Sequence, residues 1–295
     1  MITPWDDVII DCTNLTLAQA FEQSGANFEV SLKQGYYSDG PLFNEAKDYF
    51  YIMRPGYILG QCEKRYTVIQ NSILLDIAKS VPDAVLKGIG ILDKGKKVFF
   101  LMQIPNLNYT VTGSDNINTY LVIVNGHDAH TSLMMGLIPV RNWCNNMLPA
   151  VGSKLMKFRH TENAEVMIEN FKEKLKKQIE EYPAYIKKLK LLANTPVNKN
   201  ISEVFIEIFK IKDTKQGKTK LKELENLYLN EHVLIKGTWY AVYNAITGYL
   251  NYYAGRTQSS RLKSLWFGAN ANISVKALEI LHKECLNVSN AMSDV

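Results

Sequence analysis

The spacing of hydrophobic positions changes about halfway along the chain. Between residues 86 and 141 they form near-continuous apolar runs of strand length, of which 97–104 and 119–124 are typical of central strands. From residue 163 onward they recur every three or four residues, which is the spacing of one helix face. The pattern predicts an α+β protein: an N-terminal antiparallel sheet with packed helices, followed by a mainly helical C-terminal half.

The first half also carries signals for shorter elements. Capping residues precede apolar positions at helical spacing, and Gly and Pro residues separate the runs with strand character. The elements predicted here are helices over 14–25, 72–79 and from Asn142 or Asn145 to about Met156, strands over 28–32, 66–70 and 133–141, and a β-hairpin over 49–60 that turns at Arg54-Pro55-Gly56.

One long helix is expected to open the second half, over 163–194, with Pro183 kinking or breaking it. Its apolar residues form a narrow seam that suits packing against another helix, within the chain or across a subunit boundary. The seam consists of Ile168, Phe171, Leu175, Ile179, Tyr182, Ile186 and Leu189. Shorter helices are predicted over 201–211, 217–233, 239–253 and 274–288. We therefore divide the chain into an α+β sheet region, 1–160, and a helical region, 161–295, which can share one core.

Composition restricts the class of protein. Hydrophobic residues make up 46% of the 295 residues and charged residues 21%, which excludes wholesale disorder. No apolar run reaches the roughly 18 residues of a membrane span, and the acidic start at Asp6-Asp7 is unlike a secretory leader. The four cysteines fit no zinc or redox spacing, which indicates free thiols in a reducing cytosol. We expect a cytoplasmic protein without a membrane partner.

Charge is distributed unevenly. Residues 1–60 hold eight acids and three bases, whereas residues 172–220 hold thirteen lysines and six acids. A basic segment of this kind neutralises phosphates and gives affinity for nucleic acid. The alternative is a solvated, lysine-rich helix face, and the sequence alone leaves both interpretations open.

Five blocks of residues form a recognisable series. The most specific is Pro139-Val140-Arg141 followed by Cys144-Asn145-Asn146. The blocks cover 15–30, 54–71, 120–128, 139–161 and 237–268. In this order the chain resembles the phage and plasmid protein family called domain of unknown function 932, although it has Pro55 and Gly126 where that family usually has Asp and commonly has Ser. The resemblance implies a mobile-element origin and a role centred on nucleic acid, without implying a reaction.

The basic segment and the resemblance together favour a nucleic-acid-binding protein that acts in DNA replication or recombination, with single-strand binding or annealing by a homo-oligomer as the sharpest version. Its expected partner is single-stranded DNA in the host-cell cytoplasm. The candidate nucleic-acid and phosphate contacts are Arg54, Arg65, Arg141, Asn145, Lys157, Arg159, His160, Lys187, Lys188, Arg256, Arg261 and Lys263.

Two other functions stay open. Arg141, Cys144 and Asn145 at a strand-to-helix junction suit an enzyme or binder of a nucleotide or another phosphorylated small molecule, because a helix N-terminus holds phosphate. In the structural alternative Asn145 caps the helix and Arg141 pairs with an acid. The third function is an interaction protein that inhibits a host factor.

Catalytic and cofactor motifs are missing from the sequence. There is no P-loop, dinucleotide-binding loop, nucleophile elbow or zinc-protease motif. His127-Asp128-Ala129-His130 lacks a third ligand and is interpreted as a polar turn rather than a metal site. We expect no cofactor, no metal and no catalytic residue. Five tyrosines, Tyr240, Tyr243, Tyr249, Tyr252 and Tyr253, lie on one helix beside Arg256, Arg261 and Lys263, which are expected in a Gly/Ser-flanked loop. These tyrosines serve either as core or as stacking surface for bases.

Overall fold

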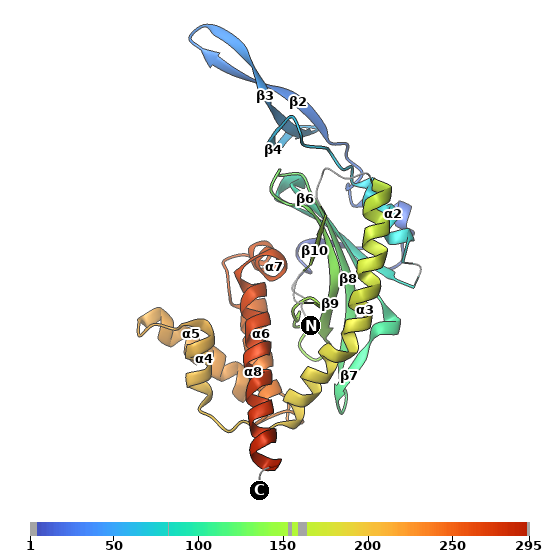
Figure 1. Cartoon of the computed structure of the whole chain (residues 1–295). Coiled ribbons are helices and arrows are strands. Elements are labelled where there is room, and N and C mark those ends of the chain that lie inside the picture. The colour runs from blue at the N-terminus through green and yellow to red at the C-terminus, as the bar shows by residue number, and fades with distance from the viewer. Residues whose placement is uncertain (1–4, 82, 153–154, 159–163, 294–295) are drawn as a thin grey trace.

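A seven-stranded antiparallel sheet forms the centre of the molecule (Figure 1). The computed structural model describes residues 5–81, 83–152, 155–158 and 164–293. The strands follow the order β1-β5-β6-β8-β9-β10, and β7 pairs with β8 as an additional strand. They are β1 (Ile9–Asp11), β5 (Val85–Leu92), β6 (Lys97–Gln103), β7 (Tyr109–Thr112), β8 (Asp115–Gly126), β9 (Leu133–Arg141) and β10 (Met156–Phe158).

The central strands are buried on both faces. Phe100 and Ile123 belong to a large hydrophobic cluster on one face, and the neighbouring Phe99 and Val122 belong to a second cluster on the other face. Strands that alternate between two covered faces need apolar residues at every position. This explains the continuous apolar runs and confirms β6 and β8 as central, adjacent strands.

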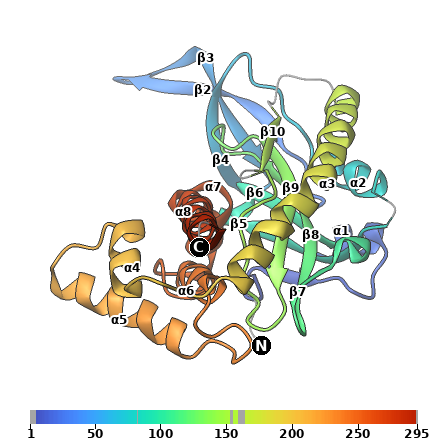
Figure 2. The ribbon, with the colours of Figure 1, turned by 60° about the horizontal axis from the view of Figure 1, so that its bottom comes forward.

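Helices α1 (Leu17–Gln23), α2 (Ser72–Lys79) and α3 (Ala164–Asn194) contribute to the larger cluster. Thr16 closes a capping box with Gln19 at the start of α1. The helix α3 crosses the sheet (Figure 2) and continues through Pro183.

The seam of α3 is occupied within the chain. Phe171, Tyr182 and Leu189 are buried, whereas Ile179 is 37% exposed. Gln178 receives a hydrogen bond from the backbone N–H of Leu137 on β9, at 3.1 Å. The seam therefore packs against the protein's own sheet and helices, and does not require a second subunit.

The remaining helices follow as a group. They are α4 (Ile201–Phe209), α5 (Lys215–Leu229), α6 (Trp239–Tyr252), α7 (Gln258–Phe267) and α8 (Ala269–Ser293). The hydroxyl of Thr238 caps α6 by accepting a hydrogen bond from the backbone N–H of Ala241, as the sequence predicts. The observed architecture confirms the α+β class, with sheets first and helices α3–α8 in the second half.

A separate three-stranded sheet projects from the body (Figure 1). It consists of β2 (Ser31–Asp39), β3 (Leu42–Arg54) and β4 (Tyr57–Glu63), and we call residues 31–63 the β-arm. Its base rests closely on the body, because a Cβ at Gly60 would lie 2.8 Å from the carbonyl carbon of Asp128. The predicted hairpin over 49–60 is confirmed as β3 and β4, and the longer β2–β3 ribbon is an addition to it.

Three sequence predictions are wrong. Residues 66–70 form a loop rather than a strand. The described residues between 142 and 155 form turns and one isolated bridge at Met147 rather than a helix. Residues 258–267, expected to be part of a loop, form α7. In the described part of the chain, no helix combines the length and the apolar character needed to cross a membrane.

Candidate functional site

Arg141 is buried in the core and paired with acids. Its Nε lies 2.8 Å from Asp115 Oδ2, and its Nη1 lies 2.9 Å from Glu231 Oε2. The side chains of Arg141 and Asp115 are both 0% exposed. Arg141 therefore does not offer its guanidinium to a phosphate at the surface, and the structural alternative, pairing with an acid, is what the structure shows.

The junction after β9 lacks the helix N-terminus on which the phosphate hypothesis depends. Asn145 takes a left-handed conformation (φ 52°) in an irregular segment, so it caps no helix. Burial raises the pKa of the Cys144 thiol, which opposes a thiolate nucleophile there. The junction therefore does not support the binding of a phosphorylated small molecule there.

His127 is also a core residue. Its Nε2 lies 2.8 Å from Oδ1 of Asn71, and the Asn71 amide donates to the carbonyl of Ala26. Asp128 accepts hydrogen bonds from Lys97 Nζ at 2.6 Å and from the backbone N–H of Thr131. Within the described residues, no three His, Cys, Asp or Glu side chains are grouped to hold a metal.

The other candidate contacts are scattered. Arg54 stacks on the rings of Phe28 and Tyr57 at the base of the β-arm. Arg261 donates to the carbonyl of Gly255, and Lys263 pairs with Asp93 at 2.9 Å. Lys157 is exposed on β10 and shares a shallow hollow with Lys263. The exposed candidates elsewhere are Arg65, Lys187, Lys188 and Arg256, and Arg159 and His160 lie outside the described residues.

The lysines of the basic segment lie on two separate parts of the molecule. The lysines of α3 are exposed, and α3 and α5 lie on opposite sides of α6 and α8 (Figures 1 and 2). Residues 210–222, which contain six lysines and one acid, form the denser of the two groups. A single basic track along all the lysine-rich helices is therefore not what the fold presents.

A groove between α5 and α6 combines the denser lysine group with aromatic rings. We call it the tyrosine–lysine groove, lined by Lys215, Gln216, Thr219, Lys220, Glu223, Tyr249 and Tyr253. The rings of Tyr249 and Tyr253 are nearly parallel, at 7°, with centroids 6.0 Å apart. Tyr253 is 50% exposed. Lys220 Nζ lies 5.9 Å from the Tyr249 ring centroid, so cation and rings occupy one surface.

Sequence reasoning found the tyrosines of this groove but paired them with the wrong cations. It placed them beside Arg256, Arg261 and Lys263, which are near in sequence. The cations that line the groove, Lys215 and Lys220, come from a helix some thirty residues earlier. The density of lysines in residues 210–222 is the sequence signal that indicates these cations.

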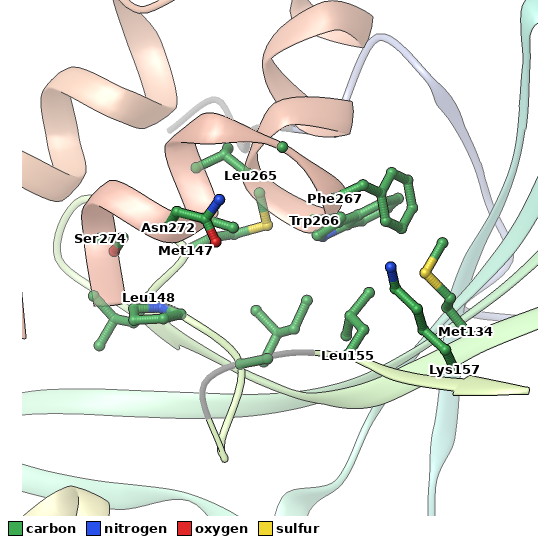
Figure 3. A pocket seen from close by; sticks show the side chains of 15 residues that line it. Met134, Met147, Leu148, Leu155, Lys157, Leu265, Trp266, Phe267, Asn272 and Ser274 are labelled. Carbon is green, nitrogen blue, oxygen red and sulfur yellow. The ribbon is translucent and has the colours of Figure 1, made fainter. Parts of the chain in front are cut away.

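A second hollow lies between the sheet and helices α7 and α8, and we call it the α7–α8 cavity (Figure 3). Its volume is about 170 Å³, and its labelled lining includes Met134, Leu155, Trp266 and Phe267. The Lys157 side chain extends toward Trp266 and Phe267 in Figure 3. The indole Nε1 of Trp266 is buried, and among the described residues it has no hydrogen-bond partner.

The fold and these surfaces define a mixed α+β protein with an antiparallel central sheet, a projecting β-arm and a lysine-rich aromatic groove. The chain belongs to the family described as Domain of unknown function (DUF932), whose model matches residues 58–266. The match begins inside β4, so strands β2 and β3 of the β-arm precede it. Comparison with curated proteins and with solved structures gave no match.

Proposed function

We propose that this protein binds single-stranded nucleic acid through the tyrosine–lysine groove, as part of the DNA replication or recombination of a phage or plasmid. The observation that carries the proposal is the pair of parallel tyrosine rings beside the lysine-rich segment. Single strands are held without sequence preference by aromatic rings that stack on bases and by cations that follow the backbone.

The groove supplies both kinds of contact. The half-exposed ring of Tyr253 can stack on a base, and the ring of Tyr249 lies beside it and nearly parallel to it. Exposed lysines of residues 210–222 can follow the phosphates, and within the described part of the chain only Lys218 of this group forms an ion pair, with Asp213 at 3.0 Å. The groove is open, which suits a flexible strand better than a rigid duplex.

Fluorescence anisotropy with a labelled single-stranded oligonucleotide tests the proposal. We expect Tyr253→Ala to weaken binding by about 5- to 150-fold, since one base–aromatic stack contributes about 1–3 kcal/mol. Lys215→Ala should reduce the slope of log affinity against log salt by about 0.7, the value for one phosphate contact on a single strand. Lys187→Ala in α3, exposed on the other side of the molecule, is the matched control and should leave the slope unchanged.

Two results would contradict the proposal. One is no binding of single-stranded or double-stranded oligonucleotide at low salt, about 50 mM. The other is binding that Lys187→Ala weakens and Tyr253→Ala does not, which would place the nucleic acid on α3.

The binding of a phosphorylated small molecule remains a second candidate, now at the α7–α8 cavity. The observation that favours it is the Lys157 ammonium beside an apolar, aromatic cavity, with Thr131 and Ser132 in the adjoining hollow. Apolar walls with a few polar groups are typical of ligand sites. Calorimetric titration with AMP should show binding that Lys157→Ala weakens at least tenfold, and equal heats for inorganic phosphate alone would exclude a role for the apolar walls.

A further inference from the structure

The outer part of the β-arm exposes large apolar side chains. Phe43 is 79% exposed and Leu42 is 66% exposed beside the turn that joins β2 and β3. Tyr36, Tyr37 and Tyr49 are each at least 50% exposed along the same ribbon. A concentration of exposed apolar surface on one projecting element marks an interaction site rather than ordinary surface variation.

This outer ribbon has little support from the rest of the chain. Strand β4 pairs with β3 only from Tyr49 to Arg54, so residues 35–48 form a two-stranded ribbon. Such a ribbon alone is marginally stable in water. Strand β2 also lies at the edge of the arm sheet, and the backbone groups of an edge strand that face away from the sheet are available for pairing.

The base of the arm, by contrast, is fixed. Gly60 packs on the backbone of Asp128, and Arg54 stacks between Phe28 and Tyr57. A small core lies at this base, formed by Ile52, Leu59 and Cys62 of the arm together with Val30 just before it. The apolar tip is therefore held away from the body in a defined direction (Figure 1).

The arm carries a hollow as well as a projecting tip. A cavity of about 290 Å³ lies where the β2–β3 register shifts between Gln34 and Gly35. Its lining residues are Gly35, Tyr36, Tyr37, Ala46, Tyr49, Phe50, Tyr51 and Gln61. On β3, the tip at Leu42 and Phe43 is three to four residues from Ala46 beside the hollow, roughly 10–13 Å in extended chain. Two arms laid side by side in opposite directions would place each tip near the other arm's hollow, which is the self-complementary arrangement of a two-fold interface.

Charge favours a protein partner over a polyanion or an anionic membrane. Along residues 31–49, Lys33 and Lys47 are offset by Asp39, Glu45 and Asp48.

We propose that the β-arm is a self-association element that pairs with the β-arm of a second copy of this chain, with Phe43 as its main apolar contact. The proposal does not depend on nucleic-acid binding, and its test uses protein alone.

Light scattering after size exclusion of the full chain tests it. The wild-type protein should have a mass of two or more chains at about 50 µM, a concentration well above the micromolar Kd expected for a weak interface. Phe43→Lys should reduce the mass to the 33.5 kDa of one chain. Val233→Lys is the matched control, because Val233 is 77% exposed but lies near α6, and it should leave the mass unchanged.

A second variant separates arm-to-arm pairing from arm-to-body pairing and guards against misfolding of Phe43→Lys. Replacing residues 36–45 by Asn-Gly joins Gly35 to Ala46 through a two-residue hairpin turn. This tagged, shortened chain should be monomeric and should not retain the untagged wild-type chain. A monomeric wild type, an unchanged mass for Phe43→Lys, or retention of the wild type by the shortened chain would each overturn the proposal, the last by placing the arm on the partner's body.

Discussion

Arg141 is among the largest side chains that the fold buries completely. Its charge is balanced by Asp115 and Glu231, and its guanidinium lies 5.1 Å from the Trp143 ring centroid and 5.4 Å from that of Tyr240. Strand β9, strand β8 and the segment before α6 meet at this side chain. Arg141 therefore connects the sheet to the helical half, a structural role for the most specific residue of the family motif.

Arg141→Ala should destabilise the fold by about 3–5 kcal/mol, because it leaves the buried Asp115 carboxylate without its partner. Urea unfolding followed by circular dichroism measures this loss. The double variant Arg141→Met with Asp115→Leu should recover part of the stability, since it removes both buried charges. A double variant that is no more stable than Arg141→Ala would contradict the unpaired Asp115 carboxylate as the origin of the loss.

Asp128 gives the fold a dependence on pH. Burial opposes its ionisation, but hydrogen bonds from Lys97 and Thr131 outweigh burial and lower its pKa to about 2. Since an unfolded Asp has a pKa of about 3.9, the carboxylate stabilises the fold above about pH 4 and loses this contribution as the pH falls toward 2. Asp128→Asn should cost about 2–3 kcal/mol at pH 7. Urea unfolding of both proteins from pH 7 to 2 should show the difference closing, and a constant difference would contradict this origin.

At the scale of elements, α6 depends on its cap. Thr238 Oγ1 accepts from the backbone N–H of Ala241 and donates to the carbonyl of Ile235. Thr238→Ala should lower the free energy of unfolding by about 1 kcal/mol, whereas Thr238→Ser keeps the hydroxyl and should cost much less. Equal losses in both variants would indicate that the methyl group, rather than the cap, provides the stabilisation.

Local signals predicted several elements well. The sequence predicts α2 with the bounds the structure shows, and α3, β6, β8 and β9 within a few residues. Their apolar periodicity agrees with the face that the fold buries. The start of α2 differs from the usual N-cap, because the Asn71 side chain makes no hydrogen bond to the helix backbone. It forms hydrogen bonds with the carbonyl of Ala26 and with His127 instead.

Long-range contacts decide the segment after β9. Asn251 on α6 binds both the N–H and the carbonyl of Met147, and the Tyr252 hydroxyl donates to the carbonyl of Cys144. These partners satisfy backbone groups that a helix would otherwise pair, and they lie about a hundred residues away. Neither propensity nor spacing around Asn145 reveals them, so the helix predicted there is wrong, and the phosphate hypothesis loses the helix N-terminus on which it depends.

At the scale of the whole molecule, the chain arranges its apolar residues in three clusters. Two lie on the faces of the central sheet and extend into the helices, and the third lies at the base of the β-arm. The sequence predicts this mixed architecture but not the orientation of the arm, because strands β2 and β3 carry aromatic residues on surfaces that the chain itself leaves exposed. The tyrosine–lysine groove and the arm also lie on different parts of the body, so binding and self-association can be altered separately.

The separate arm cluster leads to a last prediction about stability. Replacing residues 36–45 by Asn-Gly removes no residue of the two sheet clusters, so at a protein concentration low enough for single chains the shortened and wild-type proteins should melt within a few degrees of each other. If arms pair, mass action should raise the wild-type melting temperature as concentration increases, while that of the shortened chain stays constant. Thermal melts from about 1 to 100 µM, followed by circular dichroism, measure both the melting temperature of the dilute proteins and its dependence on concentration. A large loss of stability in the dilute shortened chain would mean instead that the outer ribbon supports the fold of the body, which the exposure of Phe43 and Leu42 argues against.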